Sequence, residues 1–277
     1  LGIEMAPAKL TANLEGDLTA PAGTFELGVP SLAVSGQEFS DIVLTSRMTW
    51  SEQAVLSLAN KGNFTFANRP YEVAANLVLP KDALRVEQIS LKGEHVALSG
   101  DIALPDYSIP MRGDVTLSNL DAEFFDQFGV SLVNGTVTAD IALRPDGQRQ
   151  SITANASAKG LRMASTDDTN PTMIEDVELT ATVGNAFDMP EISAELDGRD
   201  IIAGSIAVDE LALDLDGGMD ALAITLTSSG LYQGNVPIST DLAADLSLGN
   251  DIAVTANRLE AIIGDQTIEL RKPLQFV

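Results

Sequence analysis

The chain has 277 residues and a formal net charge of −24, from 16 Lys and Arg against 40 Asp and Glu. This balance argues against nucleic-acid binding, which needs a basic face, and against docking onto anionic headgroups through charge. The absence of cysteine excludes disulfides and thiolate metal sites, and a single histidine leaves little room for histidine-based catalysis or zinc chemistry.

Strict alternation of apolar and polar residues is the dominant pattern, and it predicts half-buried β-strands. In the first copy, from Ala8 to Ala20, even positions are apolar or small and odd positions are polar. The pattern returns about every 8–12 residues, which is typical of antiparallel all-β proteins, and predicts roughly fifteen strands. The larger residues expected on the apolar side are Leu10, Leu14, Leu18, Leu56, Leu58, Phe64, Phe66, Leu98, Ile102, Val137, Ile141, Leu143, Leu222, Ile224, Leu226, Leu242, Leu246, Ile252 and Val254.

One segment interrupts the strand pattern. Residues 121–128 carry three Phe at helical spacing, with Asp121 placed to cap the start and Gly129 to end the helix. The pattern predicts a short helix over 121–128, too short to cover a large sheet. We expect residues 1–277 to form a single continuous β fragment of a longer repeat-built protein, with a weak internal boundary near 118–130.

An antiparallel sheet with one apolar face must hide that face, and no helical layer is expected here to cover it. A second sheet, a closed barrel, or a curled sheet that wraps its own apolar face would each do so. The periodicity leaves two interpretations open: a structural or adhesive β-solenoid with a closed, dry core, and an open trough lined by apolar side chains. Most acids are expected on the opposite face, in contact with water.

Candidate catalytic and metal-binding groups are few. His95 is expected on the polar face of a strand with Glu94 pointing the other way, and no G-x-S-x-G elbow accompanies it. An acidic cluster near residues 217–218 is conceivable as a calcium site, but its spacing does not match an EF-hand loop. Its members are Asp209, Glu210, Asp214, Asp216 and Asp220. No sequence feature singles out a pair of carboxylates for glycoside hydrolysis, and we expect no enzymatic activity. We also expect no cofactor and no resident metal.

Two stretches combine strand patterns in a distinctive order. The first runs from Gly113 to Leu143 and contains a strand, the short Phe-rich helix and the strand sequence NGTVTADIAL. The second is the closing strand pair from Arg258 to Leu270, followed by Pro273. With these elements the chain resembles the TamB family of AsmA-like envelope proteins. The resemblance extends over most of the chain and consists of strand patterns rather than catalytic residues.

This resemblance implies a long, curled, mainly antiparallel sheet forming a trough (a β-taco) with an apolar inner face. It implies a periplasmic location in a Gram-negative bacterium, with tethering to the inner membrane by a segment not present in this chain. Members of the family are linked to phospholipid transport between the inner and outer membranes and to outer-membrane protein assembly. The expected partners are therefore phospholipid acyl chains, held by the apolar residues named above, and a TamA-type outer-membrane barrel that binds parts outside this fragment.

Overall fold

The structure is a computed structural model that describes residues 3–17, 20–51, 55–126, 131–163, 172–248 and 252–276. Strands make up 80% of the chain, they pair antiparallel, and they do not close into a barrel. The antiparallel all-β class predicted from the alternation is therefore confirmed, with 19 strands where the pattern indicated about fifteen. The chain divides into two compact units, residues 1–119 and 120–277.

Unit 1 is a meander in which each strand from β3 onward pairs with the next strand in the sequence. Its first edge is split, because β1 (Ile3–Met5) and β2 (Lys9–Glu15) both pair with β3. Pro7 lies in the gap between them. Proline has no N–H to donate to the ladder, and in the gap no ladder hydrogen bond is lost. The other strands are β3 (Ala22–Val34), β4 (Gln37–Trp50), β5 (Leu56–Phe66), β6 (Arg69–Leu79), β7 (Ala83–Gly93), β8 (Val96–Pro105) and β9 (Arg112–Asp121).

Unit 2 opens with the helix α1 (Ala122–Asp126) and continues as a second meander. The predicted cap is confirmed: Oδ1 of Asp121 accepts the backbone N–H groups of Glu123 and Phe124, at 3.1 and 3.2 Å. The predicted helix stop, Gly129, lies outside the described residues. The strands are β10 (Leu132–Asp146), β11 (Arg149–Met163), β12 (Thr172–Gly184), β13 (Glu191–Ala203), β14 (Ile206–Gly218), β15 (Ala221–Tyr232), β16 (Val236–Leu248), β17 (Ile252–Ile263), β18 (Gln266–Glu269) and β19 (Leu274–Phe276).

The strand register gives each unit one apolar face and one polar face. Residues directly opposite each other on neighbouring strands share a face, as do alternate residues along one strand. One row of such partners crosses β3 to β9 as Leu27, Leu44, Gly62, Val73, Leu91, Leu98 and Leu117. A row in unit 2 crosses β10 to β17 as Ile141, Ala154, Ala181, Ala194, Leu215, Ile224, Ala244 and Ala256. We call the faces that carry these rows the apolar faces.

Bulges inside the strands interrupt the alternation. Asp41 in β4, Gln88 in β7 and Asp200 in β13 have φ between 50° and 52°, and at Asp41 and Gln88 the pairing shifts register. An extra residue of this kind bends the strand and increases its twist. At Asp41 it also brings Phe39 opposite Phe66 on the apolar face, where strict alternation along β4 would place Phe39 on the polar face.

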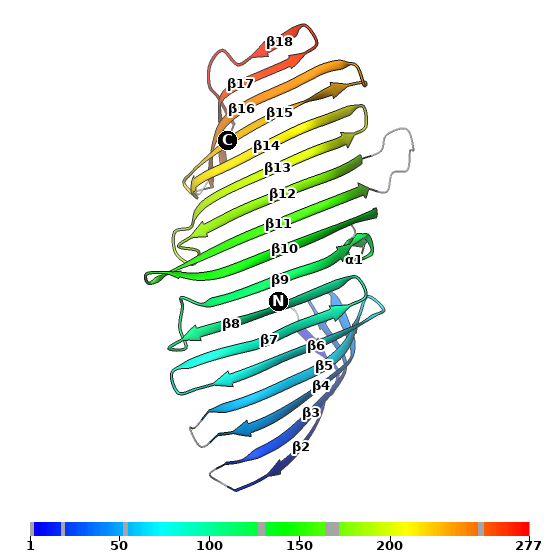
Figure 1. Cartoon of the computed structure of the whole chain (residues 1–277), viewed down its shortest axis with the longest axis vertical. Helices are drawn as coiled ribbons and strands as arrows, with labels where there is room; N and C mark the ends of the chain where they lie inside the picture. Colours follow the sequence, from blue (N-terminus) through cyan, green and yellow to red (C-terminus); the bar gives the residue numbers. More distant parts are fainter. Residues whose placement is uncertain are drawn as a thin grey trace. The chain divides into compact units, whose positions relative to one another are not determined.

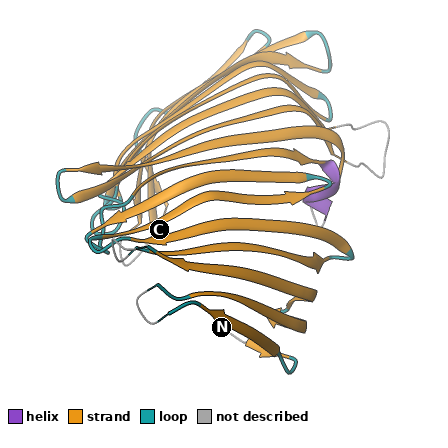
Figure 2. Cartoon of the chain, turned by 60° about the horizontal axis from the view of Figure 1, so that its bottom comes forward, coloured by secondary structure: helices purple, strands orange, loops and turns teal. Residues whose placement is uncertain are grey.

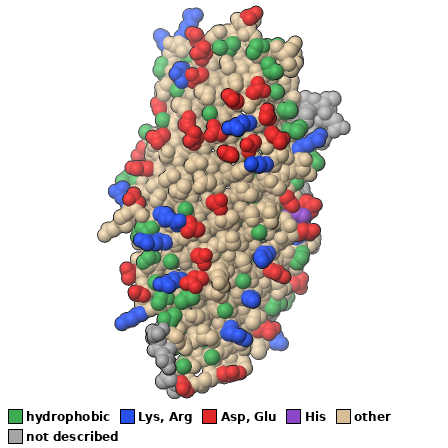
Figure 3. Space-filling view, viewed as in Figure 1, with side chains coloured by type: hydrophobic (Ala, Val, Ile, Leu, Met, Phe, Trp, Pro, Cys, Tyr) green, Lys and Arg blue, Asp and Glu red, His purple; other side chains and the backbone are tan. Residues whose placement is uncertain are grey.

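The sheet of unit 1 is curved. In Figure 1 its blue strands β2–β4 bend away behind the later strands, and Figure 2 shows the same curvature from another side. Figure 3, in the view of Figure 1, shows Lys, Arg, Asp and Glu spread over the face turned to the reader. The polar face of unit 1 is therefore convex, and its apolar face lies on the concave side.

Candidate functional site

The apolar faces have little cover. Among the described residues, the buried apolar side chains are few: Val29, Tyr71, Val96, Leu120, Ala122, Leu222 and Ala244. The chain exposes 17350 Å², whereas a compact protein of this mass would expose about 11,000 Å², or about 14,000 Å² as two separate compact domains. Most residues of the apolar rows are partly exposed, because their neighbours in the sheet cover only their flanks.

The structure brings the apolar residues predicted from the sequence together on these faces. Those that the register places on the apolar face of unit 1 are Leu10, Leu14, Leu56, Leu58, Phe64, Phe66, Leu98 and Ile102. Those on the apolar face of unit 2 are Val137, Ile141, Leu143, Leu222, Ile224, Leu226, Leu242, Leu246 and Val254. Leu18 lies outside the described residues, and for Ile252 the structure gives only a backbone position, opposite Leu248 at the start of β17.

These residues are not equally accessible. Leu10 and Leu14 on the edge strand β2 are 66% and 65% exposed, whereas Leu222 is 5% exposed and offers almost no surface to a ligand. Phe64 and Phe66 pack largely against other aromatic rings, as described below. The residues best placed to contact a ligand are therefore the half-exposed aliphatic side chains in the middle of the strands.

An aromatic cluster occupies one end of the apolar face of unit 1. Phe66 stacks on Phe39 with a centroid distance of 5.0 Å, and Phe64 stacks on Tyr71 at 5.2 Å. Tyr71 is buried, and Gly93 leaves room for its ring, since a Cβ on Gly93 would lie 2.6 Å from Cε1 of Tyr71. The cluster thus closes this end of the face with the protein's own side chains.

Two neutral polar residues lie within the same apolar face. Ser46 is opposite Asn60 and donates a hydrogen bond to its Oδ1. Nδ2 of Asn60 donates to the carbonyl oxygens of Leu58 and Ala75, at 3.0 and 3.2 Å. Because these polar atoms are satisfied within the sheet, the pair interrupts the apolar face without needing a ligand.

Formal charge is almost absent from the apolar faces. Arg69 is the one charged residue that the register places on these faces among the described strand residues. It lies opposite Phe66 and alternates with Tyr71 and Val73 along β6. Arg69 is not among the residues predicted from the sequence, although the alternating series from Tyr71 to Leu79 points back to it. A strand is recognised in the sequence by its apolar members. A charged residue at the end of the strand therefore resembles part of the neighbouring turn.

The polar faces carry the charge, and unit 2 carries most of it. Unit 2 has 8 bases against 26 acids, a net charge of −18, and unit 1 has 8 bases against 14 acids, a net charge of −6. In Figure 3 acidic side chains gather over β13 and β14. There Glu195 lies opposite Asp214, and Glu178 of β12 lies opposite Asp197. Like charges in opposite positions repel, which lowers the stability of the sheet. The same charges keep this face in contact with water.

The acidic cluster near residues 217–218 does not converge on one point. Asp209 and Asp220 are eleven positions apart in mostly extended chain, about 36 Å at 3.3 Å per residue. Asp214 accepts a hydrogen bond from Oγ1 of Thr225 at 3.1 Å. In the described part of the chain, no three His, Cys, Asp or Glu side chains are grouped so that they could hold a metal ion.

The prediction for His95 is wrong. Gly93 pairs with Val96, so Glu94 and His95 form a two-residue turn and leave the strand ladder, where alternation no longer sets side-chain direction. The His95 side chain is only 14% exposed, and its Nε2 lies 3.6 Å from Oε2 of Glu94. The two side chains therefore approach each other instead of pointing to opposite faces.

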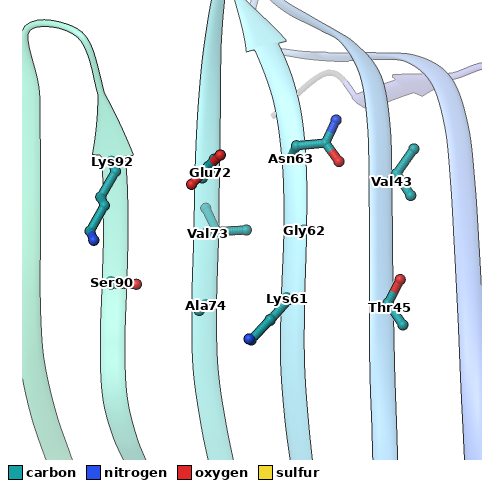
Figure 4. Close-up of a pocket in the computed structure, with 10 residues that line it drawn as sticks. All are labelled: Val43, Thr45, Lys61, Gly62, Asn63, Glu72, Val73, Ala74, Ser90 and Lys92. Carbon is teal, nitrogen blue, oxygen red and sulfur yellow. The ribbon is translucent and has the colours of Figure 1, made fainter.

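A depression of about 550 Å³ lies on the polar face of unit 1. Figure 4 shows Glu72 of β6 between Lys92 of β7 and Asn63 of β5, with Lys61 extending toward Ala74. The surface is open and polar, and it places one carboxylate among two ammonium groups. It suits water and ions, and it does not provide the apolar surroundings that the sequence predicts for a ligand.

No helix in the described residues is both long and apolar enough to cross a membrane. Comparison of the chain with protein-family models, with curated proteins and with solved structures finds no match.

Proposed function

We propose that this chain binds the acyl chains of lipids on its two apolar faces and shields them from water. The observation that carries the proposal is the uncovered apolar face that continues from strand to strand in each unit. In unit 2 the apolar rows cross eight strands, about 34 Å, and four alternate positions, about 20 Å. The outline of this face covers about 700 Å², and soluble proteins seldom leave a largely apolar face of this extent open without a binding role.

The chemistry of the faces supports hydrocarbon as the ligand. The rows consist largely of Ala, Val, Leu and Ile, and removing one methylene from water contributes roughly 0.8 kcal/mol. A hydrocarbon chain makes no directional bond, so many positions along such rows have similar energy. This surface therefore supports binding that permits sliding along the rows better than it supports one tight pose.

The resemblance to the TamB family extends the proposal to a biological setting. We place the chain in the periplasm as a non-enzymatic segment of a TamB-like protein that moves phospholipids between the two membranes. Partnership with a TamA-type barrel in outer-membrane assembly is part of the same proposal. The alternative of a closed, dry β-solenoid core loses support, because few described apolar side chains are buried and the strands do not close.

Site-specific photocrosslinking tests the proposal. A photoreactive amino acid replaces Leu98, Ile141 or Ile224 on the apolar faces, and the matched controls replace their neighbours Ser99, Asp140 or Thr225 on the polar faces. After incubation with phospholipid vesicles, mass spectrometry should detect lipid adducts at the first three positions and not at the controls. Adducts at no apolar position, or equal yields on both faces, would overturn the proposal.

A further inference from the structure

The strand β2 leaves one side of its backbone unpaired. It pairs with β3 on the other side, and among the described residues no further strand is paired with it. In Figure 1 it lies at the edge of the sheet of unit 1. All seven of its residues are exposed, including the apolar side chains of Leu10 and Leu14. An open edge of this kind is a template for a further strand, and proteins usually cover or blunt it.

The sequence of β2, KLTANLE, is complementary to itself when it is read in the opposite direction. A second copy that pairs antiparallel, with Ala12 opposite Ala12, gives all seven residues a partner. Opposite residues of such a pair share a face, so charged and polar side chains meet on one face and leucines on the other. A shift of two residues in either direction leaves two residues of each strand without a partner. In the full register the pairs on either side of the centre are Lys9 with Glu15, Leu10 with Leu14, and Thr11 with Asn13.

The charges of β2 favour this partner. Lys9 and Glu15 cancel, so the edge is neutral although the chain carries a net charge of −24. In the full register each lysine lies opposite a carboxylate of the second copy, and opposite charges in such positions stabilise a ladder. Glu15 also accepts a hydrogen bond from Nδ2 of Asn13 at 3.2 Å, and a carboxylate has further lone pairs for the lysine.

We propose that two copies of this chain associate through β2, which pairs antiparallel with β2 of the second copy about a two-fold axis. The axis runs perpendicular to the paired strands and to the sheet, so the two apolar faces lie on the same side. The pair is closed, because each copy uses the same edge and Pro7 limits the ladder at the start of β2. The edge strand β18 has only four residues, and Glu269 is its only charge, so it offers no comparable complement. This proposal does not depend on lipid binding.

Single cysteines test the register, since the chain has no cysteine of its own. Opposite residues of an antiparallel pair have Cα atoms about 4.5–5.5 Å apart, which a disulfide can bridge. In a symmetric pair the residue on the axis faces its own copy, so Ala12→Cys should give a disulfide-linked dimer under mild oxidation. Leu10→Cys is the matched control on the same face, because it would lie four positions, about 13 Å, from its own copy. We expect Ala12→Cys to link at least about tenfold faster, as measured by non-reducing electrophoresis.

Charge reversal tests the pairing of Lys9 with Glu15. In the Ala12→Cys background, Lys9→Glu and Glu15→Lys should each slow linking about tenfold, because both symmetric pairs then carry like charges. A mixture of these two variants has opposite charges in both pairs of a mixed dimer, and mixed dimers should form at about the rate of Ala12→Cys alone. Lys81→Glu, at an exposed position in the β6–β7 turn, controls for net charge and should leave the rate unchanged.

The unsubstituted chain provides a second measurement. A seven-residue strand pair buries less than the roughly 1,200 Å² of a standard interface, so we expect a weak dimer that sedimentation velocity detects between about 10 μM and 1 mM. Equal linking by Ala12→Cys and Leu10→Cys would show random collision and overturn the proposal. So would a mixture of the two charge variants that links no faster than either one, with circular dichroism confirming that both are folded. A chain that stays monomeric at about 1 mM would leave this edge to a strand of a different protein. No lipid is present, so these results leave the proposed function untouched.

Discussion

The two units share one architecture and differ in what their apolar faces offer. Unit 1 combines aliphatic rows with an aromatic cluster and Arg69, whereas the rows of unit 2 consist largely of aliphatic and small side chains. Each unit also has a neutral polar pair on its apolar face, Ser46 with Asn60 in unit 1 and Ser228 with Thr240 in unit 2. Unit 2 concentrates charge on its other face, at −18 against −6. Alternation predicts the sheet in both units, and the side chains at the alternate positions decide what kind of surface each apolar face presents.

The largest difference in stability between the two units is expected at the aromatic cluster. Tyr71→Ala should lower the stability of the protein by about 3 kcal/mol, because it removes a buried ring that stacks on Phe64. The matched change in unit 2, Tyr232→Ala, should cost less than about 1 kcal/mol, because that ring is 37% exposed. Chemical denaturation followed by fluorescence and circular dichroism measures both. Equal costs would show that the cluster does not stabilise unit 1.

Close contact between neighbouring strands is a feature that both units share, and glycine substitutions test it. A Cβ at Gly230 would collide with the carbonyl oxygen of Ala207, and one at Gly100 with that of Asp114. We expect Gly230→Ala and Gly100→Ala each to cost about 2 kcal/mol, since the backbone must shift. Gly28→Ala is the control, because nothing lies within 4 Å of its Cβ position, and it should be close to neutral. Denaturant midpoints report the difference, and a neutral Gly230→Ala would contradict the strand packing described here.

A carboxylate placed on the aliphatic face of unit 2 tests the proposed shielding of lipid directly. Ile224 lies opposite Leu215 and Ala244 on that face, and the next residue, Thr225, points to the polar face. Ile224→Asp should reduce the lipid recovered with the protein about tenfold, because bound hydrocarbon would have to cover a charge. Thr225→Asp adds the same charge on the other face and should leave lipid recovery unchanged. Equal losses in the two variants would show that the effect comes from net charge or from misfolding.

The sequence predicts the strands and their faces well, because period-two alternation reports burial of one side directly. Residues such as Ile141 and Ile224 lie where the alternation places them, on one face. The prediction from alternation fails where one residue is added to a strand or where the chain leaves the ladder. Asp41 is an ordinary polar residue until its pairing is known, and His95 follows the pattern of a strand although it lies in a turn.

The candidate site is predicted less completely for a related reason. A list of large apolar residues identifies the faces, but it omits the Ala positions that complete the rows of unit 2, such as Ala181 and Ala194. It also includes Leu222, which is buried, and it cannot show that Phe64 packs on Tyr71. Which residues contact a ligand depends on cross-strand neighbours, and those are set by register rather than by local sequence.

The smallest expected effect is a change in stability whose sign differs between the two units when one glutamate is neutralised. Glu195 in unit 2 lies opposite Asp214, whereas Glu72 in unit 1 lies opposite Lys92. Glu195→Gln should therefore raise stability by about 0.5 kcal/mol, and Glu72→Gln should lower it by a similar amount, because opposite-charge pairs stabilise a ladder and like-charge pairs do not. Both shifts should shrink as salt shortens the Debye length from about 30 Å at 0.01 M to about 3 Å at 1 M. Denaturation at the two salt concentrations measures them, and shifts of the same sign, or shifts that salt leaves unchanged, would show that the acidity of unit 2 carries no electrostatic cost.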